Sequence, residues 1–124
     1  MKIENIRLLS GEDKYDYFIR KVADFEEVWS LYDNGWALLG DGNGTELIPF
    51  WPEEAFAKLC ATNQWQDYKP RSIDMDSFLT KWLPGMEQEG KNVSVFYLSK
   101  EDKGIIKVPG DLTADLRQEL EQYE

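Results

Sequence analysis

A chain of 124 residues with 42% hydrophobic and 14% aromatic residues suits one packed domain over residues 1–124, so global disorder is not expected. Its 24 Asp and Glu against 14 Lys and Arg give a net charge of −10, which disfavours binding to nucleic acid or to an anionic membrane. A single cysteine excludes an intrachain disulfide, and the absence of a long apolar run predicts a cytoplasmic protein without signal peptide or membrane span.

The first helix is predicted to begin at Ser10. Ser10-Gly11-Glu12-Asp13 is similar to a capping box, and apolar residues follow it at helical spacing as far as Val22. This helix is expected to end near residues 24–27. In residues 3–9 the apolar spacing fits neither a helix nor a strand, and an edge strand is one interpretation.

Three strand-like runs follow the helix. Residues 28–32 lead into Asp33-Asn34-Gly35, where the Asn-Gly pair is typical of a type I′ hairpin turn. Residues 36–39 are the expected return strand. The glycine-rich stretch 40–44 is a second turn, and residues 45–50 are the third strand, so the pattern predicts a meander.

A second helix is predicted to open at Pro52 and to close at Asn63. Its expected apolar stripe consists of Ala55, Phe56, Leu59 and Cys60. Residues 68–73 are extended but contain Pro70, so any strand there is expected at the edge of a sheet.

A third helix is predicted with Asp74 as its N-cap, interrupted at Pro84-Gly85 before a last turn to Gly90. Residues 92–99 are apolar on both faces, as in a central strand, and residues 105–108 form a short partner strand ahead of a terminal helix. The predicted fold is therefore α+β: a mostly antiparallel sheet of about five strands, from an N-terminal three-strand meander and a C-terminal hairpin, packed with four helices.

The residue types present argue against common catalytic and metal sites. Without histidine, the chain lacks the usual general base and most zinc sites, and the glycines of residues 40–44 lack the sequence of a phosphate-binding loop. Residues 41–52 resemble a calcium loop but carry Glu46 and Pro52 where glycine and glutamate are required. Cys60 is expected to be a buried, inert thiol, and no carboxylate pair stands out for glycoside hydrolysis. We therefore expect no enzyme, no cofactor and no metal.

Two acidic clusters are the better candidates for a binding site. One follows the first helix and the other lies on the last helix, where Asp111, Asp115 and Glu119 recur every four residues as an exposed stripe. Such a stripe is either a solvated face or a docking face for a basic protein. The predicted partner-binding residues are Asp24, Glu26, Glu27, Asp111, Asp115, Glu119 and Glu121, with Glu124 beside them.

Leu47-Ile48-Pro49-Phe50-Trp51-Pro52, followed by Glu54 and Ala55, resembles the strand-to-helix junction of the bacterial domain of unknown function family 2750. Residues 17–18, 28–31, 78–85 and 92–93 agree with that family in the same order, and the resemblance spans roughly residues 14–120. It implies a small bacterial α+β domain without an agreed role, so it supplies no site residues. Two prolines around two large aromatics predict a rigid junction packed in the core, or else the rim of an aromatic pocket.

Two functions remain as hypotheses. The first is a non-enzymatic, acidic inhibitor, such as an immunity protein that neutralises a basic bacterial toxin, for example a nuclease. The alternative is a small-ligand or peptide-binding domain of unknown cellular role. Its pocket would be lined by Trp36, Phe50, Trp51, Trp65 and Trp82.

Overall fold

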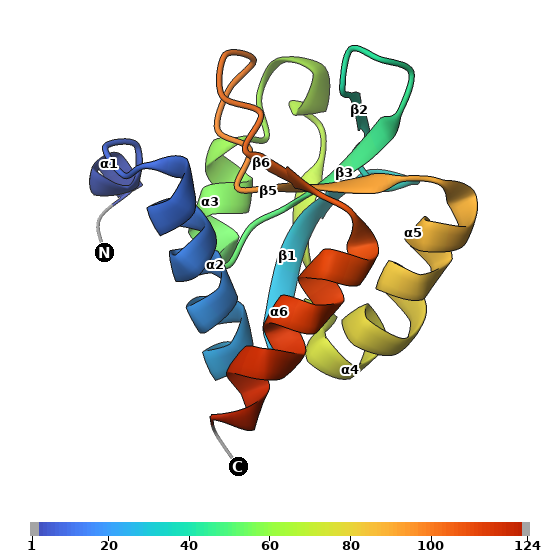
Figure 1. The fold of residues 1–124 in the computed structure, drawn as a ribbon. Coiled ribbons are helices and arrows are strands. Elements are labelled where there is room, and N and C mark those ends of the chain that lie inside the picture. Colours follow the sequence, from blue (N-terminus) through green and yellow to red (C-terminus); the bar gives the residue numbers. More distant parts are fainter. Residues whose placement is uncertain (1–2, 123–124) are drawn as a thin grey trace.

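The secondary structure alternates helices with short strands. A computed structural model describes residues 3–122 and confirms an α+β fold (Figure 1). In chain order the elements are α1 (Ile3–Ile6), α2 (Gly11–Phe25), β1 (Glu27–Tyr32), β2 (Leu39–Gly40), β3 (Glu46–Phe50), α3 (Glu54–Leu59), the 3-10 turn η1 (Asn63–Trp65), β4 (Lys69–Asp74), α4 (Met75–Ser77), the π-helix η2 (Phe78–Trp82), α5 (Leu83–Glu89), β5 (Asn92–Val95), β6 (Ile105–Lys107) and α6 (Pro109–Glu121).

The strands in residues 3–122 form two sheets. β1 and β4 make an antiparallel pair, and the other sheet has the order β2-β3-β5-β6. Its pairs are antiparallel except for β3 and β5, which run parallel. A bridge between Trp29 and Trp51 joins β1 to the end of β3, so the two sheets share one core.

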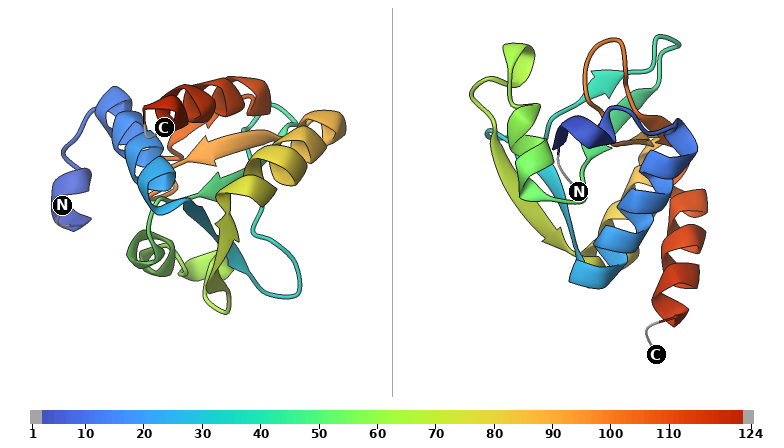
Figure 2. Two further views of the ribbon diagram at one scale, coloured as in Figure 1. Left: turned by 90° about the horizontal axis from the view of Figure 1, so that it is seen from below. Right: turned by 90° about the vertical axis from the view of Figure 1, so that its left-hand side faces the viewer.

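The helices cover the larger sheet mainly from one side. Figure 2 shows α2, α6 and α5 in a row there, with α6 between the other two. α3 lies on the opposite side, where it packs against β1 and β4. The contact between α2 and α6 matters most for the functional argument, because these two helices carry most of the predicted acidic residues.

Of the predicted three-strand meander, only the pairing of its last two strands, β2 and β3, is formed. β2 does pair with β3, but β1 pairs with β4 along its whole length, with Val28 opposite Ile73. The chain does turn at residues 33–35, with Asn34 at φ 54°, but Gly35 lacks the positive φ that a type I′ turn requires, so the predicted turn type was wrong. One bridge, between Tyr32 and Trp36, follows the turn. One more hydrogen bond, from the Ala37 amide to the Leu31 carbonyl (2.9 Å), holds the chain to β1, and the Trp36 ring packs against Trp82 of η2.

The predicted N-caps Ser10 and Asp74 are present, whereas the second predicted helix begins at Glu54 instead of Pro52. The Ser10 hydroxyl accepts a hydrogen bond from the Asp13 amide (3.1 Å), and the Asp74 carboxylate accepts one from the Ser77 amide (2.8 Å). Glu26, at φ 55°, ends α2. Residues 3–6 form a short helix instead of the edge strand that was one interpretation.

The second predicted helix is shorter than expected and rotated about its axis. α3 ends at Leu59, and Asn63 begins the 3-10 turn η1. Phe56 and Cys60 are buried as predicted, whereas Ala55 and Leu59 are exposed and Ala57 is buried in their place. The Pro49–Pro52 junction is buried throughout, which confirms its role in core packing.

Pro84 does not interrupt its helix. α4, η2 and α5 form one continuous helical rod, which ends at Gly90 with φ 72°. A proline inside an α-helix clashes with the carbonyl four residues earlier, here that of Thr80. In η2 the Leu83 amide donates to the carbonyl of Phe78, five residues back, and this wider turn lets the helix continue past the proline ring.

Candidate binding sites

Two of the predicted acidic residues line a groove between α2 and α6. Its volume is about 480 Å³, and Asp115 and Glu119 contribute to it from α6. From α2 come acidic residues that the sequence argument did not select, and none of the nine lining residues is basic. This acidic groove is lined by Glu12, Asp13, Tyr15, Asp16, Ile19, Asp115, Gln118, Glu119 and Gln122.

A hydrogen bond fixes the two walls of the acidic groove to each other. The Tyr15 hydroxyl donates to Asp115 Oδ2 at 2.5 Å, and the Lys107 ammonium lies 4.6 Å from the centre of the Tyr15 ring. Burial, the bond to Asp115 and the charges of Asp115 and Asp111 raise the pKa of Tyr15 far above its usual value. The phenol therefore stays protonated and keeps donating to the carboxylate throughout the physiological pH range.

The other predicted acidic residues lie outside the groove lining. Asp24 and Glu26 are exposed at the C-terminal end of α2, and Glu27 is half-buried in β1. Asp111 is exposed in the first turn of α6 and Glu121 at its end, whereas Glu124 lies outside the described residues. The C-terminal ends of α2 and α6 lie at the same end of the molecule (Figures 1 and 2), so Asp24 and Glu26 lie toward the same end as Glu121. Asp111 lies at the other end of α6, so the two predicted clusters come together only in part.

The aromatic residues of the ligand-binding hypothesis divide into two groups. Phe50, Trp51 and Trp65 are buried in the core and do not line the same cleft as Trp36 and Trp82. Trp65 borders a separate hollow of about 280 Å³. Trp36 and Trp82 are half-buried and line a cleft of about 410 Å³. This tryptophan cleft is bounded by Trp36, Leu38, Ile48, Lys81, Trp82, Gly85, Met86, Glu89 and Lys91.

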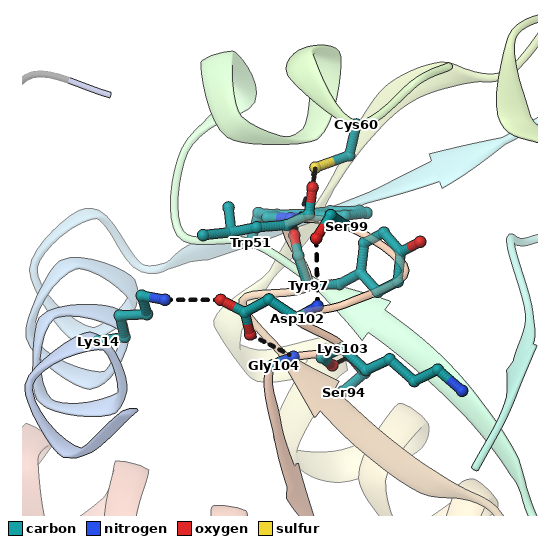
Figure 3. Close-up of polar contacts among 10 residues, drawn as sticks. Lys14, Trp51, Cys60, Ser94, Tyr97, Ser99, Asp102, Lys103 and Gly104 are labelled. Carbon is teal, nitrogen blue, oxygen red and sulfur yellow. Dashed lines mark hydrogen bonds and ion pairs between the residues drawn. The ribbon is translucent and has the colours of Figure 1, made fainter. Parts of the chain in front are cut away.

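A third group of side chains surrounds the carbonyl oxygen of Tyr97 (Figure 3). The Trp51 indole Nε1 donates to this oxygen at 2.6 Å, and the Cys60 thiol lies 3.3 Å from it. Cys60 is 4% exposed, and burial raises the pKa of its thiol to about 11. The predicted burial of Cys60 is confirmed, and its side chain contributes to the packing of the core.

Thiol chemistry should reflect this burial. We expect iodoacetamide to alkylate Cys60 in the native protein at pH 8 at least about 100-fold more slowly than in the urea-unfolded chain, because the reactive thiolate is suppressed and covered. Mass spectrometry of quenched samples measures the alkylation rates, and similar rates in the two states would contradict the burial of the thiol.

The raised pKa of Cys60 also gives stability below about pH 9 that is lost as the pH rises through about 11, since the unfolded thiol ionises first.

The loop between β5 and β6 is fixed by a polar network (Figure 3). The Lys14 ammonium lies 2.7 Å from Asp102 Oδ2, with the Lys14 side chain 7% exposed and that of Asp102 43% exposed. Asp102 Oδ1 accepts a hydrogen bond from the Gly104 amide (3.2 Å), and the Ser94 hydroxyl donates to the Lys103 carbonyl (2.5 Å). Sequence reasoning missed this network, because Lys14 lies 88 residues from its partner.

The loop that superficially resembled a calcium site is a tight turn. Asp41 Oδ1 accepts hydrogen bonds from the amides of Asn43 (2.6 Å) and Thr45 (3.1 Å), and these bonds lower the pKa of Asp41. Among the described residues no group of three or more Asp, Glu, Cys or His side chains is placed to hold a metal ion. Nor does a helix within residues 3–122 have the length and apolar character needed to cross a membrane.

Comparison with known families gives one match. The profile described as "Protein of unknown function (DUF2750)" matches residues 15–116, most of the chain. The chain belongs to the DUF2750 family. Neither the curated proteins nor the solved structures contain a match.

The tryptophan cleft and the acidic groove differ in how far their lining residues fall within the DUF2750 match. All residues that line the tryptophan cleft fall inside residues 15–116. Glu12, Asp13 and Glu119 of the acidic groove fall outside this range, whereas Asp16 and Asp115 lie within it. In this DUF2750 protein the cleft is thus built wholly from the family segment, and the acidic groove extends beyond it on both sides.

Proposed function

We propose that this protein is a non-enzymatic binding module that receives a basic protein on its acidic groove, as an immunity-type inhibitor of a bacterial toxin would. One observation carries the proposal: α2 and α6 bring the carboxylates of five residues to a single groove without a basic residue in its lining. These residues are Glu12, Asp13, Asp16, Asp115 and Glu119. A concave surface of one charge focuses its field toward the solvent and accelerates association with a partner of opposite charge.

The ion pairs of the described residues leave most of these carboxylates available. Arg20 lies 3.0 Å from Asp16, and both side chains are more than half exposed, so this pair exchanges readily with a partner's arginine or lysine. Asp115 is oriented by Tyr15 and keeps its second oxygen as an acceptor. A toxin that binds phosphates through arginines and lysines presents the matching charges, and a cytoplasmic inhibitor would meet it before it reaches its target.

The proposal is tested by reversing charges in the groove and outside it. The genes next to this one are first searched for a basic, toxin-like protein. That protein serves as the probe, with affinity measured by calorimetry at salt concentrations from about 50 to about 300 mM. We expect the Asp16→Lys, Glu119→Lys double variant to bind at least about tenfold more weakly and to show a smaller dependence on salt.

A charge-matched control separates the groove from net charge. Asp67→Lys with Glu101→Lys changes the net charge equally at exposed positions outside the groove, and we expect this variant to lose less than about threefold in affinity. Equal losses of affinity in the two double variants, or no binding by the wild-type chain, would contradict the proposal.

A further inference from the structure

The tryptophan cleft is independent of the acidic groove and has the features of a small-molecule site. Its volume of about 410 Å³ falls in the range of pockets that hold small organic ligands. Leu38, Ile48 and Met86 supply aliphatic surface, and the charged groups Lys81, Glu89 and Lys91 complete the lining. An apolar lining with a few polar groups is the composition expected of a ligand pocket.

Buried aromatic rings of the core support the two tryptophans that form the wall of the cleft. The rings of Trp36 and Trp82 meet edge to face, with centroids 4.7 Å apart and planes at 86°. Trp82 in turn contacts the buried Phe50 ring at 6.0 Å, which itself contacts Phe78 at 4.9 Å. A row of rings therefore runs from the core to the cleft, so the exposed indole faces are already ordered before a flat ligand arrives.

The π-helix η2, whose wider turn accommodates Pro84, also places side chains at this cleft. It contains Lys81 and Trp82, and the α-helix that continues from it supplies Gly85, Met86 and Glu89. π-helical turns are rare and occur frequently at functional sites, where the extra residue changes the direction of side chains. Here the wider turn delivers one aromatic and one cationic side chain to the same cleft.

The charged residues that line the tryptophan cleft indicate which class of ligand it would bind. Lys91 is paired with Glu89 at 2.7 Å, so these two charges offset each other. Lys81 is exposed and has no ion pair within the part of the chain that the structure describes. The lining therefore keeps one cation available beside two indoles, although the whole chain carries a net charge of −10.

We propose that the tryptophan cleft binds a small aromatic carboxylate, with its ring against Trp36 and Trp82 and its carboxylate paired with Lys81. The flat apolar body fits the ordered indole wall, and the anion fits the one unpaired ammonium of the cleft. A neutral ring would keep only the first of these contacts, and a cationic ring would be repelled by Lys81.

Three probes of the same shape test the class of ligand. 2-Naphthoate, 2-naphthamide and 2-naphthylmethylammonium are titrated into the full chain, and the indole N–H signals of Trp36 and Trp82 are followed by NMR. We expect 2-naphthoate to shift both signals, leaving those of Trp51 and Trp65 in place, and to bind about tenfold more tightly than the amide. Equal binding of the carboxylate and the amide, or tighter binding of the ammonium, would overturn the proposed class.

Two variants test the place of binding. Gly85 has open space within 4 Å of where a Cβ would lie, so Gly85→Leu fills the cleft and also improves the helix. We expect it to abolish 2-naphthoate binding without lowering the melting temperature, whereas Gly85→Ala binds within about threefold of wild type. Lys81→Met should remove the preference for carboxylate over amide and leave amide binding unchanged.

The same measurements contain the results that would refute the site. Unchanged 2-naphthoate binding in Gly85→Leu would place the ligand elsewhere. Absence of any shift at Trp36 and Trp82 up to about 5 mM probe, enough to saturate a millimolar site, would show that the cleft does not take aromatic carboxylates. Neither result bears on the acidic groove, because the two surfaces share no lining residue.

Discussion

Gly104→Ala should lower the free energy of unfolding by about 3 kcal/mol or more, the largest effect expected from a single added methyl group in this protein. Gly104 has φ +79°, where an L side chain is strained, and an added Cβ would overlap the carbonyl oxygen of Val95. It would also lie 2.9 Å from the carbonyl carbon of Phe96 and from the amide nitrogen of Tyr97. These are backbone atoms of the β5 end, which cannot turn aside as a flexible side chain can.

Gly42→Ala is the matched control for this prediction. Gly42 has φ +89°, a similar backbone conformation, but nothing lies within 4 Å of its added Cβ. We expect it to cost only about 1 kcal/mol, the strain of the backbone alone. Urea denaturation of both variants measures the difference, and equal destabilisation would mean that the loop relaxes around the new methyl group.

Trp51→Phe should destabilise the protein by about 3 kcal/mol. The Trp51 side chain is fully buried, so the smaller ring leaves a cavity, and the Tyr97 carbonyl loses its 2.6 Å hydrogen bond from the indole. Trp36→Phe, at the half-buried wall of the tryptophan cleft, should cost less than about 1.5 kcal/mol, because its ring is partly in solvent already. A cost at Trp51 no larger than at Trp36 would contradict the core role of the junction.

Local signals in the sequence predicted the starts of α2 and of the helix that follows Asp74, and the position of the turn at Asn34. Ser10, Asp74 and Asn34 each carry out the capping or turn function expected of their residue type, because that chemistry acts within a few residues. The pairing of β1 with β4 could not be predicted in this way. It joins residues far apart in sequence, and the apolar pattern of a strand does not specify its partner.

Only one wall of the acidic groove could be predicted from the sequence, because the other wall depends on contacts between residues far apart in the chain. Asp115 and Glu119 were selected from their spacing along one helix, and they do line the groove. The opposite wall is set by how α2 packs on α6, which leaves Glu12 and Asp16 facing the groove and Asp24 outside it. The i,i+4 spacing of Glu12 and Asp16 beside the buried stripe of α2 was a usable signal, but only once the neighbouring helix was known.

The pairing of strands has a consequence for how the chain folds. Val28 pairs with Ile73, and Ile48 pairs with Val93, so each sheet requires contact between positions 45 residues apart. The two closures interleave along the chain, because β3 lies between β1 and β4, and β4 lies between β3 and β5. Contacts of such high sequence separation slow folding, since the entropy of closing the loop is lost before the contacts form. We therefore expect slow, highly cooperative folding in which neither sheet persists after the other is lost, so that the acidic groove and the tryptophan cleft appear and disappear together.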